Sequence, residues 1–170
     1  MKFSASESKE AVFKKVESII AEDYGFNIVS KDSQRPWGGF LVIDEAQSLK
    51  FIETFFSHLS TEDFKGFSKL SPKILLVAPE KRLSWQYHHR RAEIWKVIGG
   101  KAGVIVSETN QETPVAELKQ GDVIDLEREH RHRLVGLDEW GVIAEIWKHT
   151  DPDNPSDEDD IVRVQDDFGR

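Results

Sequence analysis

The chain has 170 residues, and its 31 acidic and 23 basic side chains give a net charge of −8. This length is typical of one folded domain with a sizeable core, and the hydrophobic content of 38% with ten Phe and five Trp excludes a disordered chain. The negative charge argues against a general binder of nucleic acid or anionic membranes. The absence of Cys excludes disulfides, thiolate metal sites and a Cys nucleophile.

No segment reaches the run of about 18 apolar residues that a membrane span needs. Charged residues interrupt the first 21 positions too often for a signal peptide. We therefore expect a cytoplasmic protein with neither a membrane nor a nucleic acid as partner.

The first third of the sequence has the apolar spacing of helices. Apolar residues recur every three or four positions between Val12 and Ile20, after a capping box that starts at Ser4. A second helix is predicted over about 45–59, with Asp44 near its N-cap. Because each helix has one apolar face, we expect both to pack against a sheet.

From residue 73 onward, short strands alternate with turn residues. The predicted strands cover residues 73–78, 83–87, 93–98, 103–108, 122–127, 132–135 and 142–148. Gly99-Gly100 is interpreted as a hairpin turn between two of them. About seven short strands at this spacing predict an antiparallel sandwich or a small barrel.

The last twenty residues form an acidic segment. Eight acidic and two basic side chains give residues 151–170 a net charge of −6, which leaves only −2 for the rest of the chain. The global charge therefore does not argue against a small anionic ligand. Two interpretations stay open for this segment, a flexible C-terminus and a segment that folds over the barrel mouth.

We expect a single domain made of three parts: a helical extension over 1–70, a barrel core over 71–150 and the acidic segment over 151–170.

Two histidine clusters carry the functional information. In a strand, Gln86 and His88 point to the same face, and Glu93 can return to that face after a bend. His132 lies about forty residues later, which is far enough for a neighbouring strand. Two imidazoles, a carboxylate and an amide oxygen would make a mixed N/O site that suits Zn, Fe, Mn, Co or Ni. The alternative is a set of surface His and Arg residues on amphipathic strands.

These intervals resemble the two cupin motifs, G-x5-H-x-H-x3,4-E-x6-G and G-x5-P-x-G-x2-H-x3-N. The aligned positions are Gln86, His88, Glu93 and Gly100 in the first motif, and Gly121 and His132 in the second. The resemblance implies a mainly β fold, a cupin double-stranded β-helix (jelly-roll barrel) with the N-terminal α-helices packed outside. It also implies one divalent metal ion, with Zn expected first and Mn, Fe, Co or Ni as alternatives.

Gln86 stands in the place of the first motif His, and four further motif positions differ from the cupin pattern. Glu replaces Gly at positions 80 and 129, Glu replaces Pro at 127, and Gly replaces Asn at 136. Because Pro and Gly shape the turn before the last ligand, we expect the loop around 127–129 to take another conformation. His130 then competes with His132 for the ligand role, and the interval favours His132.

Beyond the cupin pattern, an ordered series of segments resembles the C-terminal domain of type II phosphomannose isomerases. The matching segments are RPWG at 35–38, LSWQYHH at 83–89, RAEIW at 91–95, HRL at 132–134, EI at 145–146, EDDIVR at 158–163 and DFGR at 167–170. Residues 1–34 and about 44–70 have no counterpart in this resemblance.

The family resemblance implies metal-assisted aldose–ketose isomerisation of a sugar phosphate, mannose 6-phosphate to fructose 6-phosphate in the family. By analogy, the metal ligands are Gln86, His88, Glu93 and His132. Arg91 and Arg133 are expected to clamp the phosphate, with solvated pairing to carboxylates as the alternative. The base stays open among His89, His130, Glu127 and Glu129.

Two further substitutions leave the substrate open, since Arg90 replaces the family's third consecutive His and Ile94 replaces the His after the motif Glu. The alternatives are a non-enzymatic metal- or sugar-binding cupin and a cupin enzyme that acts on another sugar, such as a heptose phosphate, or an Fe-dependent dioxygenase. The expected partner is a small sugar phosphate, with a homodimer through edge strands as one mode of assembly.

Overall fold

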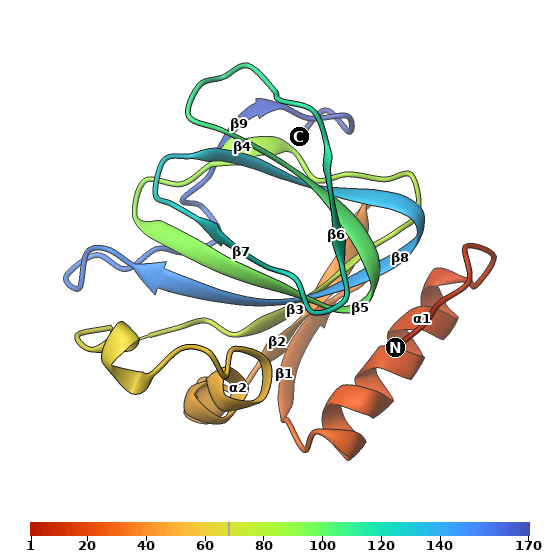
Figure 1. Ribbon diagram of the computed structural model, residues 1–170, viewed down its shortest axis with the longest axis horizontal. Helices are drawn as coiled ribbons and strands as arrows, with labels where there is room; N and C mark the ends of the chain where they lie inside the picture. The colour runs from red at the N-terminus through yellow and green to blue at the C-terminus, as the bar shows by residue number, and fades with distance from the viewer. Residues whose placement is uncertain (68) are drawn as a thin grey trace.

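The computed structural model describes residues 1–67 and 69–170 (Figure 1). The helical elements are α1 (Lys9–Ser18), the π-turn η1 (Ile19–Asp23), the 3-10 turn η2 (Glu45–Gln47), α2 (Ser48–Phe55) and the 3-10 turn η3 (Thr61–Phe64). The strands are β1 (Ile28–Asp32), β2 (Gly38–Ile43), β3 (Lys73–Val77), β4 (Trp85–Tyr87), β5 (Arg91–Ser107), β6 (Ala116–Lys119), β7 (Val123–Leu126), β8 (Arg131–His149) and β9 (Val162–Gln165).

Two long strands, β5 and β8, organise the barrel. They pair antiparallel over almost their whole lengths, and each contributes to two sheets. The first part of β5 and the last part of β8 belong to a sheet with the strand order β1-β2-β3-β8-β5-β7. The last part of β5 and the first part of β8 belong to a sheet with the order β9-β4-β8-β5-β6. In the described part of the chain, the hydrogen-bonded path does not close into a ring. The mainly β, cupin-type double-stranded β-helix is confirmed.

The predicted hairpin at Gly99-Gly100 is wrong. β5 continues through both glycines, and the pairing with β8 shifts register on each side of them, between 97 and 99 and between 100 and 102. Gly100 has φ +59°, and a Cβ there would lie 1.9 Å from the carbonyl oxygen of Trp140. The glycines therefore bend one long strand instead of reversing the chain. In the same way, two of the predicted strands are the two ends of β8.

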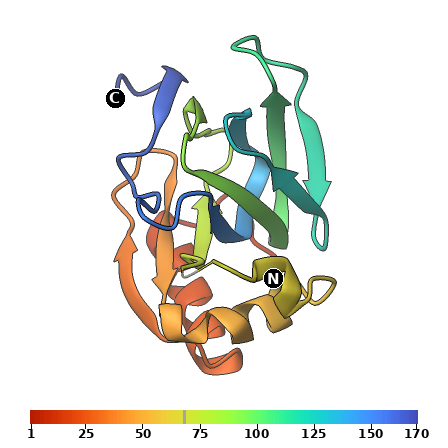
Figure 2. The same ribbon diagram turned by 90° about the vertical axis from the view of Figure 1, so that its left-hand side faces the viewer.

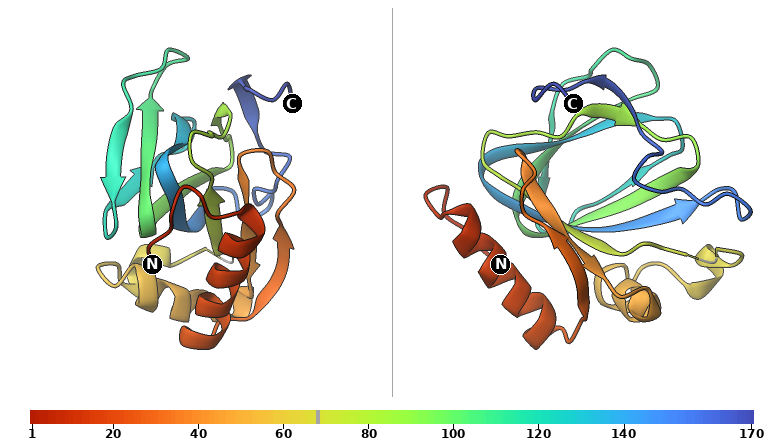
Figure 3. Two further views of the ribbon diagram at one scale, coloured as in Figure 1. Left: turned by 90° about the vertical axis from the view of Figure 1, so that its right-hand side faces the viewer. Right: turned by 180° about the vertical axis from the view of Figure 1, so that it is seen from behind.

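The N-terminal helices cover the outer face of the β1-β2-β3 sheet, as Figures 1 and 3 show. α1 begins one turn later than the predicted capping box, because the Oγ of Ser8 accepts a hydrogen bond from the N–H of Ala11 at 3.2 Å. α2 ends at Phe55, four residues before the predicted end. Alternate residues of β3 divide between two cores: Ile74 packs with the helices and Leu75 packs inside the barrel.

The barrel interior has an apolar end and a polar end. Val77, Val97 and Ile143 belong to the inner hydrophobic cluster at one end. At the other end, four residues away in β3 and β5 and two residues away in β8, the inward positions carry the buried charged side chains Lys73, Glu93 and Glu145. Since burying charges costs free energy unless they are paired, these side chains require partners at this end of the barrel.

The acidic C-terminal segment is folded against the barrel. Its strand β9 pairs antiparallel with β4, and Figure 2 shows it beside that strand. This finding favours the segment that covers the barrel mouth over the flexible C-terminus. The division into a helical extension, a barrel core and an acidic segment stays a prediction.

Within residues 1–67 and 69–170, no helix is long and apolar enough to cross a membrane. The expected cytoplasmic location stays a prediction.

The bend at Gly100 predicts a stability effect. Replacing Gly100 with Ala forces a Cβ into the Trp140 carbonyl and a side chain into positive φ. We expect the free energy of unfolding to fall by about 2–4 kcal/mol in urea titrations. The matched control is Gly121→Ala, where φ is +99° but no atom lies within 4 Å, so only backbone strain of about 1–2 kcal/mol applies. Equal losses in the two variants would contradict the steric explanation.

Candidate metal centre and pocket

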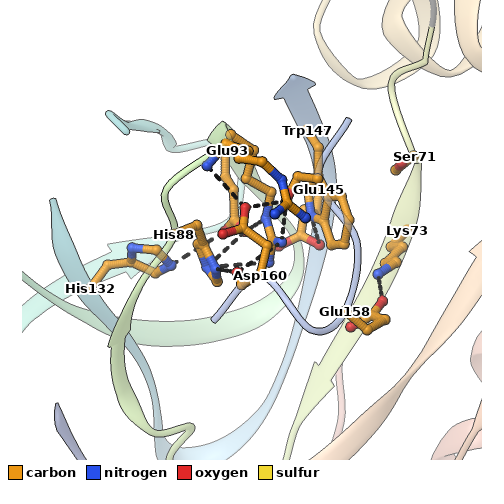
Figure 4. A network of polar contacts seen from close by, with 12 residues as sticks. Ser71, Lys73, His88, Glu93, His132, Glu145, Trp147, Glu158 and Asp160 are labelled. Atoms are coloured by element: carbon orange, nitrogen blue, oxygen red, sulfur yellow. Dashed lines mark hydrogen bonds and ion pairs between the residues drawn. The ribbon is translucent and has the colours of Figure 1, made fainter. Parts of the chain in front are cut away.

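Three buried side chains meet at the polar end of the barrel. His88 follows β4, Glu93 lies on β5 and His132 lies on β8, and their exposed fractions are 2%, 3% and 2%. One ligand atom from each lies within 4.8 Å of the others. The Nε2 atoms of His88 and His132 lie 3.2 and 3.4 Å from the carboxylate of Glu93, and Figure 4 shows the three side chains together. The structure therefore brings together three of the four ligands implied by the family resemblance.

Both histidines have the orientation that metal ligation needs. The Nδ1 of His88 lies 2.7 Å from the carbonyl oxygen of Asp160, and the Nδ1 of His132 lies 3.1 Å from the carbonyl oxygen of His130. A carbonyl only accepts, so each Nδ1 carries the proton and each Nε2 keeps its lone pair.

The Nε2 of His132 is buried and makes no hydrogen bond to any residue that the structure describes, although it lies 3.4 Å from Glu93 Oε2. An unpartnered buried nitrogen beside a carboxylate is the donor set of a cation site.

The electrostatics keep these groups in their metal-binding forms. Burial alone would raise the pKa of Glu93, but the nearby His88 and Arg91 outweigh it and hold that pKa well below its usual value. Arg91 donates from Nε to Glu93 Oε1 at 2.7 Å. Burial lowers the pKa of His88 to about 3. At neutral pH the cluster thus holds a carboxylate and a neutral imidazole, the forms that bind a divalent cation.

The C-terminal segment holds this cluster in place through Asp160. Its carboxylate accepts hydrogen bonds from the backbone N–H groups of His89 and Arg90, both at 3.0 Å, and from the Oγ of Ser156 at 2.6 Å. Its carbonyl orients His88, as described above. Ser156 also accepts from Arg91 at 2.8 Å. The segment 156–160 therefore supports both a candidate ligand and the cation that neutralises Glu93.

A pocket of about 410 Å³ adjoins the cluster, and Glu93 lies on its wall. Gln86 lines the same pocket and is the direct cross-strand partner of His132, so the two side chains share one face of the sheet. The amide oxygen of Gln86 accepts a hydrogen bond from the hydroxyl of Ser84. Gln86 is thus placed beside the cluster, as the family resemblance implies.

Glu145 is a functional candidate that was not predicted as a site residue from the sequence, where it belongs only to the matching segment EI at 145–146. It lines the pocket at 4% exposure, and its two oxygens accept hydrogen bonds from the indole N–H groups of Trp95 and Trp147 at 2.7 and 2.9 Å. Burial raises the pKa of Glu145 to about 8. The sequence signal is a lone acid at an inward position of an otherwise apolar strand, between Ile143 and Trp147.

The two predicted phosphate-binding arginines separate in the structure. Arg91 lines the pocket, and its guanidinium lies 3.6 Å from the centre of the Trp147 ring. Arg133 follows the inward-facing His132 and points to the other side of the sheet. There it donates to the Leu83 carbonyl at 2.8 Å and to Glu112 at 2.6 Å, and also to Gln165. The structure does not bring Arg133 to the pocket.

The candidate bases of the sequence also lie outside the cluster. The side chain of His89 is 55% exposed and pairs with Glu129 at 3.3 Å. His130 lies just before β8, is 30% exposed and is 3.8 Å from Glu127. These four side chains face the solvent side of the loop, so their catalytic role stays a prediction without support from the geometry.

Both Glu residues that replace a cupin-motif Gly keep a positive φ. Glu80 has φ +58° and Glu129 has φ +66°. A side chain in this region costs about 1–2 kcal/mol. The chain therefore retains backbone turns that favour glycine at both positions. The expected change of conformation around 127–129 stays a prediction.

The jelly-roll arrangement and the buried His-Glu-His cluster are those of a cupin. Residues 60–166 match the family described as Mannose-6-phosphate isomerase C-terminal. Because this match covers more than half of the chain, the chain belongs to that family. A comparison with curated proteins found no match.

Solved structures with a similar fold come from different functional classes. The capsular polysaccharide assembling protein CapF from Staphylococcus aureus is 16% identical with a TM-score of 0.52, over 83% of this chain and 34% of that chain. Hazelnut (Corylus avellana) vicilin is 15% identical with a TM-score of 0.53, over 83% and 34%. Tomato (Solanum lycopersicum) vicilin is 16% identical with a TM-score of 0.50, over 78% and 32%. The chain spans about a third of the length of each, and the likeness shows the fold alone.

The raised pKa of Glu145 predicts a pH dependence of stability. Between pH 5 and 8 the folded protein keeps a proton that the unfolded chain releases, so the free energy of unfolding falls as pH rises. We expect Glu145 to contribute a fall of roughly 2–4 kcal/mol in metal-free protein. Glu145→Gln cannot ionise and should lose this contribution.

Urea titrations at pH 5, 6.5 and 8 measure this contribution as the difference in slope between wild type and variant. The control is Glu117→Gln, which changes an exposed acid on β6. A Glu145→Gln slope equal to that of wild type would mean that Glu145 does not keep its proton in the folded protein.

Proposed function

We propose that this protein is a metal-dependent aldose–ketose isomerase that acts on a sugar phosphate of the mannose 6-phosphate and fructose 6-phosphate type. The observation that carries the proposal is the buried His88–Glu93–His132 cluster beside a pocket. The Nε2 of His132 has no hydrogen-bond partner among the described residues, and the Nε2 of His88 lies 3.2 Å from the guanidinium of Arg91. The pocket volume of about 410 Å³ lies in the range of small-molecule sites. Membership of the Mannose-6-phosphate isomerase C-terminal family supports the reaction class.

The residues present fit a divalent metal ion. The unpartnered, buried Nε2 of His132 is the observation that tests the fit, because it has no role in the hydrogen bonding of the barrel. His88, Glu93 and His132 would hold the ion, with the amide oxygen of Gln86 as the expected fourth ligand. This mixed set suits Zn first, and also Mn, Fe, Co or Ni. When bound, a divalent ion polarises the sugar oxygens and stabilises negative charge on them.

Glu145 is the group that we assign to proton transfer. The isomerisation moves one proton from C2 to C1 of the sugar and one from O2 to O1, so atoms balance without another reactant. Glu145 lines the pocket, both of its oxygens are fixed by indole N–H groups, and a pKa of about 8 lets it take and return a proton near neutral pH. It takes the proton from C2 as a carboxylate and delivers it to C1 as the acid.

Arg91 and Trp147 support this arrangement. Arg91 neutralises Glu93 and stacks on Trp147, while Trp147 donates to Glu145. Lys73, which is the cross-strand partner of Glu145, lies 3.9 Å from the centre of the Trp147 ring and forms an ion pair with Glu158. These contacts fix the base relative to the cluster, which the transfer of a proton between adjacent carbons requires.

The metal assignment is tested by a matched pair of histidine variants. We expect wild type to retain one divalent ion per chain after dialysis. His132→Ala should weaken metal affinity by at least ~10–100-fold, and His130→Ala should leave it unchanged. The measurements are elemental analysis and competition with a chromophoric chelator, with circular dichroism as the check of folding. Wild type without metal affinity, or equal affinities in both variants, would contradict the assignment.

Turnover is tested with the same proteins. Metal-loaded wild type and His130→Ala should interconvert mannose 6-phosphate and fructose 6-phosphate, while His132→Ala and Glu145→Gln should lose activity. Hexose and heptose phosphates are assayed with Zn, Mn, Fe, Co and Ni. Metal and sugar binding without turnover of any of them would reject the isomerase in favour of a non-enzymatic binding cupin.

A further inference from the structure

A row of three side chains crosses one wall of the pocket from β8 to β9. His132 on β8 is the direct cross-strand partner of Gln86 on β4, and Gln86 is the partner of Arg163 on β9. Directly paired residues of antiparallel strands point to the same face of a sheet. Gln86 and Arg163 both line the pocket. The pairing therefore places a cation in line with the candidate metal ligands.

The separation along this row matches a ligand with two recognised ends. Neighbouring strands lie about 4.7–4.9 Å apart, so two strand steps place the backbones of Arg163 and His132 about 9–10 Å apart. Because the arginine side chain is long, the distance from its guanidinium to the cluster can be shorter or longer than this backbone separation. A molecule that places its sugar oxygens at the cluster would thus present its opposite end to Arg163.

Arg163 differs from the other arginines of the pocket in having no acidic partner. Arg35 pairs with Asp32 at 2.8 Å, Arg91 with Glu93 at 2.7 Å, and Arg170 with Asp166 at 3.0 Å. Among residues 1–67 and 69–170, no carboxylate lies within ion-pair distance of Arg163, and its guanidinium makes no hydrogen bond there. A guanidinium without a partner on a pocket wall is suited to a bidentate contact with an anion.

The acids near this end of the pocket do not cancel the charge of Arg163. Glu158 is paired with Lys73, and Asp159 is exposed. Arg35 and Arg170 line the same pocket, but each is paired with an acid. The anion-binding end is therefore formed by Arg163 on β9.

We propose that Arg163 binds the terminal phosphate of the substrate. This subsite selects a phosphorylated sugar over the neutral sugar, and Arg163 takes the phosphate-binding role that is predicted for Arg133 from the sequence. The inference deepens the proposed function and rests on it for the sugar. The discrimination between phosphorylated and neutral ligand can be measured without turnover.

The experiment compares Arg163→Ala with Arg128→Ala, which changes an exposed arginine outside the pocket lining. Isothermal titration of the metal-loaded full chain uses mannose 6-phosphate, mannose and inorganic phosphate as ligands. We expect wild type and Arg128→Ala to prefer mannose 6-phosphate over mannose. Arg163→Ala should weaken the binding of mannose 6-phosphate and of phosphate about 10–100-fold and leave the affinity for mannose unchanged. Arg163→Lys should restore part of the loss.

If turnover is found, Arg163→Ala should raise KM for the sugar phosphate with kcat little changed. Turnover with equal mannose 6-phosphate affinity in the Arg163 and Arg128 variants would overturn the inference and leave the proposed function standing. Phosphate discrimination that depends on Arg163 in a protein without turnover would overturn the isomerase and leave the subsite standing. A wild type that binds neither mannose 6-phosphate nor phosphate would overturn both. Thermal melting checks that each variant is folded.

Discussion

The carboxylate of Glu93 is the constraint from which the rest of the barrel mouth follows. An isolated buried carboxylate would cost several kcal/mol, so it persists only with partners that are themselves held in place. Arg91 supplies the charge, and His88 and His132 approach with their Nε2 atoms. Arg91 and His88 are in turn fixed by residues 156–160. The cluster, the pocket wall and the C-terminal segment are therefore one connected polar network, and a change in any part is transmitted to Glu93.

The molecule separates this polar network from the groups that stabilise the fold. The helices α1 and α2 add a second hydrophobic core on the outer face of the sheet, which contains residues such as Phe13 and Phe51. The inner core fills the opposite end of the barrel and reaches the pocket at Leu75 and Trp95. Because each fully buried apolar side chain contributes about 1.5–3 kcal/mol, the outer core can offset the charges buried at the mouth. The helices α1 and α2 thus stabilise the barrel without lining the pocket.

The cluster is predictable from the sequence because the spacing between its residues carries the signal. Alternate residues of a strand point to the same face of a sheet, so the spacing predicts which side chains share a face. Sequence reasoning failed where one pattern has two structural meanings. Gly99-Gly100 fits a hairpin turn and also a bend within one strand, and only the pairing with β8 decides between them. The nearness of Arg133 to His132 in sequence predicts a shared site, but adjacent residues of a strand face opposite sides. Glu145 and Arg163 lie in matching segments, and the roles proposed for them rest on burial and register.

The support of His88 by Asp160 has a consequence for synthesis. A chain that emerges from the ribosome up to β8 already carries both histidines, Glu93 and Glu145, yet it lacks the carbonyl that orients His88 and the serine that holds Arg91. In such a chain, the side chains of His88 and Arg91, which contact the carboxylate of Glu93, would be free to rotate. The centre therefore becomes ordered only after residues 156–160, which are translated after β8, have packed against His88 and Arg91.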